Sequence, residues 1–315
     1  MKHLFKKCAN EVFFMADAGK VGVVTVTYNS AGVLDDFIAS LLRQTHEDFI
    51  LYAVDNASVD GTLDKLGEYK DPRIAVIANK NNVGVAEGNN QGVRAAFAAG
   101  CDSILFINND TVFDLSLIES LVNGMKQHGA DMIAPKILFH DNPTLIWCAG
   151  GGFKPAKGYV GVHYGMGEVD RGQFDTVRRL DHAPTCCLLV QRSVFDKIGL
   201  MDARYFVYID DADFCFRARQ AGMKLVYLPS ATLLHKASSL TGGAESEFAV
   251  RYSTRNHIYF MLKNLGPWLG LYFLPEYQVR LCAKFLLRKI KFSEFVLQQK
   301  AFFEGLRMWR HSAAQ

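Results

Sequence analysis

Two short stretches of the sequence place carboxylates and amides where they could do chemistry. In the first, the apolar run ILFI at 104–107 ends in Asn108, Asn109 and Asp110. A hard divalent cation such as Mg²⁺ or Mn²⁺ prefers oxygen ligands, and a bound pyrophosphate needs such a cation to neutralise its charge. Asp110 is therefore the best metal ligand of the three, with phosphate oxygens and water completing the shell.

The second stretch is YIDDADFCFR at 208–217, where Asp210, Asp211 and Asp213 open an expected helix. The helix dipole favours negative charge at this end, so ordinary N-terminal capping is one interpretation. The apolar residues 205–209 favour another, in which the acids lie at the end of a buried segment. A carboxylate held near other carboxylates has a raised pKa and can serve as a general base.

An alternation of strands and helices would position both stretches. Apolar runs predict strands at 21–28, 49–54, 73–78 and 104–107, with helical patterns between them. Strands filled on both faces predict an α/β fold, in which helices cover both sides of a mainly parallel sheet. Sheets of this kind bind ligands at the carboxyl ends of their strands.

Polar residues follow the end of each of these strands. They are Thr27 to Asn29, then Asp55 to Ser58, then Asn79 to Asn82, then Asn108 to Asp110. Each group alone is compatible with turn and capping chemistry. Together they would form a polar crescent suited to a base, a ribose and a metal-bound phosphate.

The remainder of the chain divides into three regions. The glycine-rich segment 150–172 is expected to be a loop or hairpin, and the following strands and helices, with His182 and the cysteine pair 186–187 in the core, extend to about 240. Beyond that point the pattern is mostly helical. We therefore expect an α/β domain at 20–240 and a basic helical extension at 241–315, which has 11 Lys and Arg against 5 Asp and Glu.

Composition limits the class of protein further. Half of the 315 residues are hydrophobic, which is typical of a globular core, and the net charge of +3 is too small to indicate nucleic acid as a partner. The seven cysteines lack the spacing of a zinc site and fit a reducing compartment. No apolar run reaches the roughly 18 residues of a membrane span, and the opening run is too short for a signal peptide. A cytoplasmic location is expected.

The stretch RLCAKFLLRKIKF at 280–292 mixes basic residues with Leu, Phe and Ile. A helix with such a face would lie on the cytoplasmic face of an anionic membrane. Packing against the α/β domain, or a contact in a homodimer, would explain the pattern equally well. The sequence leaves these interpretations open.

Five strings, taken in order, resemble the family 2 inverting glycosyltransferases of the GT-A fold, and most closely their rhamnosyltransferase-like bacterial branch. The strings are VTYNS, VDNASVDGT, NVGVAEGNNQGVRAA, INND and GLMDARYFVYIDDADFCFRARQAG. The resemblance extends from about Val21 to about His235, and RYSTRNHIYFMLKN at 251–264 resembles a segment that follows the catalytic domain in that branch.

The resemblance implies roles for the matching positions. Asp211 matches the catalytic base, Asp110 matches the metal-binding residue of the family's Asp-x-Asp motif, and His235 matches a histidine that can complete the metal site. The positions that match the donor-nucleotide site are Thr27, Tyr28, Asn29, Asp55, Asn82, Gly88, Asn89, Asn108, Asn109 and Arg255, the last as a contact of the leaving diphosphate. Acceptor contacts are expected from Asp210, Asp213 and Trp147, whose ring could stack on a sugar.

The chain departs from the family pattern at a few positions. Asn108 replaces the first Asp of the motif, which removes one carboxylate from the expected metal site. Asp210 replaces the more usual Glu, and Ala203 stands where related sequences carry Glu.

The resemblance implies an inverting, metal-dependent transferase that uses Mg²⁺ or Mn²⁺. Its donor would be dTDP-rhamnose or a UDP-hexose, and its acceptor a saccharide or lipid-linked saccharide of bacterial cell-surface polysaccharide synthesis. A non-catalytic sugar-nucleotide-binding scaffold is one alternative, although Asp110 and Asp211 are both present. A nucleotidyltransferase of related fold is another, but it should carry a Gly-rich basic phosphate loop after the first strand, and TYNSAGVLDD supplies none.

Overall fold

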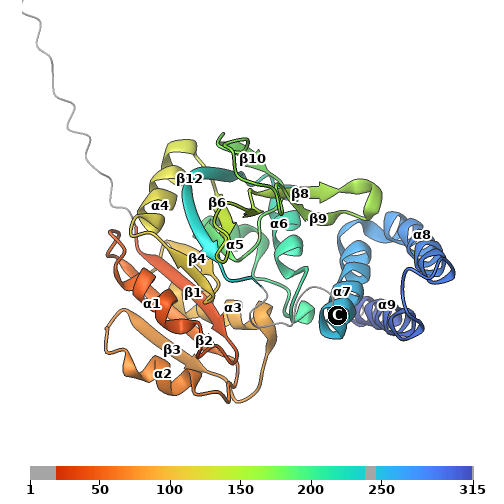
Figure 1. Ribbon diagram of the computed structural model, residues 1–315, viewed down its shortest axis with the longest axis horizontal. Helices are drawn as coiled ribbons and strands as arrows, with labels where there is room; N and C mark the ends of the chain where they lie inside the picture. Colours follow the sequence, from red (N-terminus) through yellow and green to blue (C-terminus); the bar gives the residue numbers. More distant parts are fainter. Residues whose placement is uncertain (1–18, 238–245, 314–315) are drawn as a thin grey trace, which may run out of the picture.

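The computed structural model describes residues 19–237 and 246–313. Over these ranges the chain forms an α/β part followed by three long helices (Figure 1). The expected boundary at 240/241 lies outside the described residues, as does most of the opening stretch considered for a signal peptide.

The first half of the chain alternates strands and helices, as predicted. Its elements are β1 (Val21–Thr27), α1 (Leu34–Leu42), β2 (Phe49–Asp55), α2 (Thr62–Glu68), β3 (Ile74–Ala78), α3 (Gly84–Ala98) and β4 (Ser103–Ile107). Strands β1, β2 and β4 are buried over nearly their whole length. Because their apolar side chains point to both faces, helices must cover both sides of the sheet.

The second half adds shorter strands and the glycine-rich hairpin. Its elements are β5 (Thr111–Phe113), α4 (Leu117–His128), β6 (Met132–Phe139), β7 (Ile146–Cys148), β8 (Gly151–Lys154), β9 (Val160–His163), β10 (Arg178–Leu180), β11 (Cys187–Gln191), α5 (Arg192–Ile198), α6 (Asp210–Gln220) and β12 (Leu225–His235). Strands β8 and β9 pair with each other, so the segment at 150–172 contains the expected hairpin.

The central sheet has the order β10-β12-β6-β11-β4-β1-β2-β3. Strands β3, β2, β1 and β4 are parallel, as the sequence predicts. Strand β11 is antiparallel to both β4 and β6, whereas β12 runs parallel to β6. The whole sheet is therefore mixed, because β11 enters beside β4 in the opposite direction.

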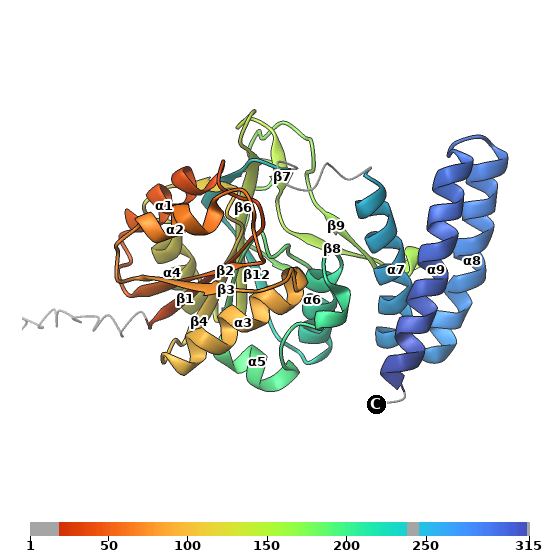
Figure 2. The ribbon, with the colours of Figure 1, turned by 90° about the horizontal axis from the view of Figure 1, so that it is seen from below.

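Helices form a layer on each face of the sheet (Figure 2). Helices α1, α2 and α4 lie on one face, where Phe37, Leu41 and Leu121 pack against the strands. Helices α3, α5 and α6 lie on the other face, where Val93 and Phe214 are buried. This arrangement leaves the carboxyl ends of the parallel strands at one edge.

Three helices at the C-terminal end form a separate bundle beside the α6 edge: α7 (Glu247–Asn264), α8 (Gly266–Leu286) and α9 (Phe292–Ala313) (Figure 2). Buried Tyr259, Phe260 and Phe302 pack there against Tyr205 and Phe216 of the α/β part. A shared apolar core therefore joins α7 to the segment around α6.

The stretch predicted as one basic helix at 280–292 is divided in the structure. Helix α8 continues through Pro275 but ends at Leu286, and the left-handed backbone of Arg288, with φ 54°, turns the chain toward α9. Lys289 and Lys291 thus lie on the connection rather than on a helix face. In the described ranges no helix is both long and apolar enough to cross a bilayer.

Candidate active site

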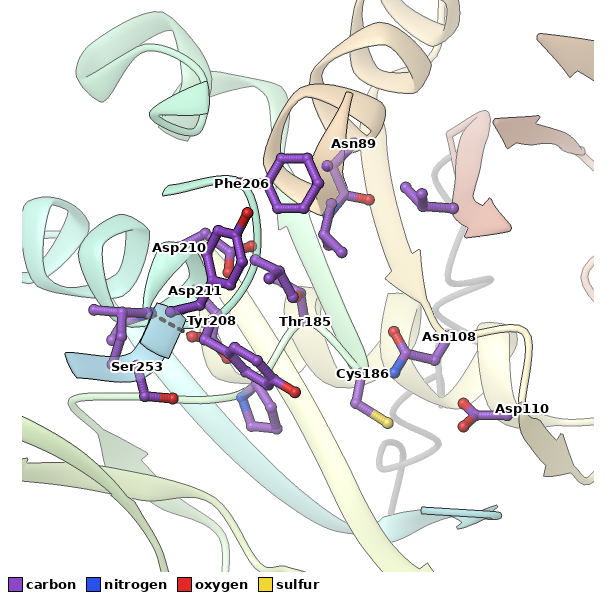
Figure 3. A pocket seen from close by; sticks show the side chains of 18 of the residues that line it. Asn89, Asn108, Asp110, Thr185, Cys186, Phe206, Tyr208, Asp210, Asp211 and Ser253 are labelled. Carbon is purple, nitrogen blue, oxygen red and sulfur yellow. Dashed lines mark hydrogen bonds between the residues drawn. The ribbon is translucent and has the colours of Figure 1, made fainter. Parts of the chain in front are cut away.

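A pocket of about 980 Å³ lies where the ends of β1 and β4 meet the end of β12 and helix α7. Small-molecule sites commonly have this size. In Figure 3, Asn108 and Asp110 lie on one side, Asp210 and Asp211 lie on the other, and Cys186 lies between them. The two acidic stretches of the sequence therefore meet in one cavity.

The turn after β4 supplies polar side chains to the first side of the pocket. Asn108 is exposed in the wall, and Asp110 is 6% exposed. The amide of Asn109 also borders the pocket, but it donates a hydrogen bond to the Val26 carbonyl at 2.8 Å. Asn109 therefore ties β4 to β1, which fixes the backbone that presents Asn108 and Asp110.

Asp110 and His235 together fit a divalent cation. The Nε2 atom of His235 lies 3.2 Å from Oδ1 of Asp110, and both side chains are buried. Neighbouring ligands of an octahedral ion with bonds of about 2.1 Å lie roughly 3 Å apart. The Nδ1 atom of His235 is buried and has no hydrogen-bond partner among the described residues. The edge-on ring of Trp147, 4.5 Å away between centroids, holds the imidazole in place.

The protein contributes few ligands to this position. No group of three or more His, Cys, Asp or Glu side chains that could hold a metal occurs in the part of the chain that the structure describes. One carboxylate and one imidazole would leave most of the coordination shell to ligand oxygens and water. This donor set is compatible with Mg²⁺ or Mn²⁺ in the presence of a diphosphate.

Asp210 and Asp211 are the first residues of α6 and differ in protonation. Burial and then the neighbouring Asp211 charge raise the pKa of Asp210 to about 8. Burial alone would raise the pKa of Asp211 too, but the nearby His182 reverses this and lowers it below the usual value. At neutral pH the pair therefore shares one proton, and Asp211 is the ionised member.

His182 is the neighbour that lowers the pKa of Asp211. Its Nε2 atom lies 3.8 Å from Oδ2 of Asp211, which is longer than a hydrogen bond, so the attraction acts through space. The ring stacks on His163 at 5.8 Å between centroids, and burial and then His182 lower the pKa of His163 to about 4. His182 is buried as expected, but it also lines the pocket.

Residues 204–209, here named the acid loop, lead into Asp210. Three of them have a left-handed backbone: Phe206 at φ 67°, Tyr208 at 64° and Ile209 at 67°. Side chains other than glycine adopt this conformation at a free-energy cost of about 1–3 kcal/mol each, and they keep it only when their surroundings hold it. The acid loop is therefore a strained connection that sets the position of the acid pair.

The beginning of α3 supports the acid loop on one side. The Val85 amide donates a hydrogen bond to the Phe206 carbonyl at 2.5 Å. Gly84 has φ +85°, and a Cβ at this position would lie 2.5 Å from both the carbonyl oxygen and the ring of Phe206. Only glycine allows this approach, so the contact between α3 and the acid loop requires Gly84, a position to which the resemblance to the family assigned no role.

The residues expected to bind the donor nucleotide divide into two groups. Tyr28, Asn82, Asn89, Asn108 and Asn109 line the pocket, whereas Thr27, Asn29, Asp55 and Gly88 are not among its lining residues. Asp55 is fully buried and accepts hydrogen bonds from the hydroxyl groups of Thr27 and Ser58 at 2.9 and 2.5 Å. In this structure Asp55 fixes the loop behind the pocket wall, and its contact with a base stays a prediction.

Arg255 and Asp213 also lie outside the pocket lining. The Arg255 guanidinium donates hydrogen bonds to the carbonyls of Arg204 at 3.1 Å and Tyr205 at 2.7 Å. Asp213 is fully buried and accepts hydrogen bonds from Tyr205, Arg217, Lys263 and Asn264. Protein groups therefore already occupy both side chains: Arg255, the expected diphosphate contact, and Asp213, an expected acceptor contact. Trp147, the third expected acceptor contact, does line the pocket.

Helix α7 contributes to the pocket through residues other than the expected Arg255. Phe248, Tyr252 and Ser253 line it, together with His163 and Met166 from the hairpin region. Tyr252 and Ser253 belong to the segment 251–264 that resembles the family, but the resemblance assigned a role there only to Arg255, and Phe248 lies outside that segment. The expected division at 240/241 therefore does not separate the pocket from the C-terminal extension.

Comparison with known proteins identifies a family. Residues 22–199, more than half of the chain, match the sequence model described as glycosyl transferase family 2. A Mycobacterium tuberculosis protein named N-acetylglucosaminyl-diphospho-decaprenol L-rhamnosyltransferase is 26% identical over 78% of this chain and 85% of its own length. A Shigella flexneri protein named dTDP-rhamnosyl transferase RfbF is 22% identical over 78% of this chain and 81% of its own length.

A solved structure supports the fold. The crystal structure of GalNAc-T7 with UDP, GalNAc and Mn²⁺ superposes with a TM-score of 0.59 and 15% sequence identity. The match covers 78% of this chain and 48% of that one, so this chain corresponds to about half of GalNAc-T7. At this identity the likeness establishes the GT-A fold alone.

Proposed function

Because the chain belongs to glycosyl transferase family 2, we propose that it transfers a sugar from a nucleotide-sugar donor to an acceptor hydroxyl with inversion at the anomeric carbon. One observation carries the proposal. An ionised Asp211 and the Asp110–His235 pair line the same pocket, and Figure 3 places Asp110 across it from Asp211. A base and a diphosphate site on opposite sides of one cavity suit a single in-line displacement.

Asp211 acts as the base in this scheme. Its carboxylate takes the proton of the acceptor hydroxyl while that oxygen bonds to the anomeric carbon. The bond from the anomeric carbon to the diphosphate oxygen breaks, and its electron pair leaves with the nucleoside diphosphate. Asp210, whose pKa is raised to about 8, keeps its own proton, so Asp211 is the carboxylate that takes the proton of the hydroxyl.

Asp110 and His235 hold the diphosphate end of the donor. A divalent cation bound there, Mg²⁺ or Mn²⁺, would neutralise the negative charge that develops on the leaving diphosphate. The Mn²⁺ in the GalNAc-T7 structure supports a cation in this fold. Asn108, exposed in the wall beside Asp110, is placed to donate hydrogen bonds to phosphate or sugar oxygens.

The relatives support a choice of substrates. Two of them are named as rhamnosyltransferases, which supports dTDP-rhamnose as the donor, with a UDP-hexose as the second choice. The mycobacterial name includes a diphospho-decaprenol acceptor, which supports a saccharide or lipid-linked saccharide acceptor. The reaction would then belong to bacterial cell-surface polysaccharide synthesis.

A thermal-shift panel tests the proposal without knowledge of the acceptor. The protein is heated with dTDP-rhamnose, UDP-glucose, UDP-galactose, UDP-GlcNAc or GDP-mannose, each with and without Mn²⁺. A ligand that binds only the folded state raises the melting temperature. We expect a Mn²⁺-dependent rise with one donor, and its loss in Asp110→Ala. A folded protein that responds to no donor would contradict the proposal, and a response only to a nucleoside triphosphate, added as a sixth ligand, would support the nucleotidyltransferase. A sugar-nucleotide-binding scaffold would show the shift but release no nucleoside diphosphate.

The C-terminal helices suggest where a lipid-linked acceptor is met. Along α8, Trp268, Tyr272, Val279 and Leu286 recur at helical spacing and are 85%, 70%, 68% and 78% exposed. An exposed apolar stripe of this kind marks an interaction surface. The basic residues of the 287–291 connection lie at the end of the stripe. We propose that this face rests on an anionic bilayer, because aromatic and basic residues favour that interface.

Liposome sedimentation tests the membrane contact. Vesicles containing phosphatidylglycerol should retain the protein at low salt, and Trp268→Ser with Lys289→Ser should release it. As a control, Val59→Ser changes an 89% exposed apolar residue far from α8 in the sequence. Release by the control as well, or retention on neutral vesicles alone, would contradict the contact. A homodimer formed through the same stripe would instead appear as a mass that the Trp268 variant halves.

A further inference from the structure

We propose that Asn256 of α7 is a positioning residue for the catalytic acids: its side-chain amide holds the acid loop in the strained conformation that presents Asp210 and Asp211. The inference rests on the proposed function of Asp211. It goes beyond that function, because it makes helix α7 part of the catalytic unit.

The amide of Asn256 is fully buried and directed at the acid loop. Its two Nδ2–H groups lie within hydrogen-bond distance of three carbonyls, those of Tyr205 at 2.9 Å, Val207 at 2.7 Å and Tyr208 at 2.8 Å, so one N–H is shared between two of them. The Arg255 Nε atom donates to Oδ1 of the same amide at 2.8 Å. Because Oδ1 is taken by this donor, the NH₂ group must face the loop.

All six carbonyls of the acid loop have a hydrogen-bond donor. Asn256 holds three of them, and Arg255 adds a bond to Tyr205 and holds Arg204. The carbonyl of Phe206 accepts from the amide of Val85, and that of Ile209 accepts from the amide of Asp213. The loop is therefore fixed by α7 on one side and by the start of α3 on the other.

The hydrogen bonds from Asn256 fall where the backbone is strained. Tyr208 and Ile209, with φ 64° and 67°, directly precede Asp210. Without the amide, the carbonyls of Val207 and Tyr208 would lose the only donor that the structure gives them. A buried carbonyl without a donor is destabilised by about 1–3 kcal/mol. The segment would then relax toward an ordinary conformation, and the carboxyl groups of the acid pair would move with it.

Two variants and a matched control test this role. Asn256→Ala removes the amide, and Asn256→Asp keeps its size but replaces the NH₂ donor by an oxygen that repels the three carbonyls. The control is Thr254→Ala on the same helix, because the Thr254 hydroxyl pairs with Tyr277 of α8 rather than with the acid loop. Each protein is assayed for nucleoside diphosphate release from the donor identified by the panel, with water in place of the acceptor hydroxyl, and for amide hydrogen exchange.

We expect kcat to fall about 100-fold in both Asn256 variants, as a displacement of about 1 Å at a catalytic group can produce. The KM for the donor and the thermal shift with UDP or dTDP and Mn²⁺ should stay within about twofold, because Asp110 and His235 are untouched. Amide exchange should accelerate at 204–213. Thr254→Ala should keep kcat and the exchange pattern of that segment.

Other results would overturn the inference. It fails if Asn256→Ala keeps the wild-type kcat, or if the control loses as much activity as the variants. If neither variant folds, Asn256→Ser, which keeps a single hydroxyl donor, takes their place in the same comparison. Failure of the proposed function looks different, since the wild-type protein itself would then release no nucleoside diphosphate.

Discussion

Gly84 offers a direct test of how closely catalysis depends on the acid loop. A Cβ at this position would lie 2.5 Å from the carbonyl oxygen and from a ring carbon of Phe206, and 2.8 Å from its Cα. Ordinary contacts of a Cβ begin near 3.4 Å. In Gly84→Ala, α3 and the acid loop must therefore separate by roughly 1 Å, which is enough to reduce the rate about 100-fold if Asp211 moves with the loop.

The same substitution also destabilises the fold. Alanine at φ +85° carries a backbone penalty of about 1–2 kcal/mol, and the steric overlap adds about 1–3 kcal/mol. We expect Gly84→Ala to lose 2–5 kcal/mol in all, as the sum of these two ranges, by urea unfolding. Activity is compared at a temperature where the variant is fully folded, so that the loss of rate is separate from the loss of stability.

Gly92, two turns further along α3, is a matched control. A Cβ there would overlap the Val24 side chain in the core, but Gly92 has an ordinary helical backbone and no contact with the acid loop. Gly92→Ala should therefore destabilise by about 1–3 kcal/mol and keep kcat within about threefold. A folded and fully active Gly84→Ala, or an equal loss of kcat in the two variants, would show that catalysis does not depend on the contact between Gly84 and the acid loop.

Three further predictions concern the buried charges. His182→Gln removes the group that lowers the pKa of Asp211, so the acidic limb of the pH–rate profile should move to higher pH; an unchanged limb would contradict the through-space contact. Asp213→Asn removes a carboxylate that pairs with Lys263 and Arg217 in the interior, and urea unfolding should show a loss of about 3 kcal/mol or more. The pKa of Asp210 is about 8 in the folded state, whereas an unfolded aspartate loses its proton near pH 4. Between these pH values the native state binds more protons than the unfolded state. The free energy of unfolding should therefore fall as the pH rises, by at most about 1.4 kcal/mol per pH unit. Asp210→Asn should remove that slope, and an identical slope in the variant would show that the proton lies elsewhere.

The sequence predicts the parts of this molecule that follow local rules. Apolar runs ending in polar residues located β1, β2, β3 and β4 and the edge at which they meet, because period and composition determine strands. Polar residues that follow those runs, such as Asn108 and Asp110, therefore line the pocket.

Residues whose roles depend on long-range packing were harder to predict. Asp55 is the last residue of β2, yet its side chain does not reach the pocket as that of Asp110 does. The hydroxyl groups of Thr27 and Ser58 enclose it, which no spacing reveals. Arg255 has the positive charge that could bind a diphosphate, but its guanidinium donates hydrogen bonds to the acid loop instead. The sequence predicts His182 only as a core residue, because an apolar context says nothing about a neighbour 3.8 Å away across the fold.

The end of α8 shows a different limit. Residues 280–292 have helical composition throughout, and the left-handed turn at Arg288 replaces further helix because α9 returns there along the bundle (Figure 2). Tertiary packing commonly overrides helix propensity in this way. Basic and apolar residues that the sequence places on one helix are therefore divided between a helix face and a turn.

The most direct test of the central claim is a crystal structure of the protein with Mn²⁺ and the nucleoside diphosphate of its donor. We predict the cation on Asp110 and His235, the diphosphate beside Asn108, and an open position for an acceptor hydroxyl at Asp211. A nucleotide bound outside this pocket, or a cation held by Asp210 and Asp211 instead, would contradict it.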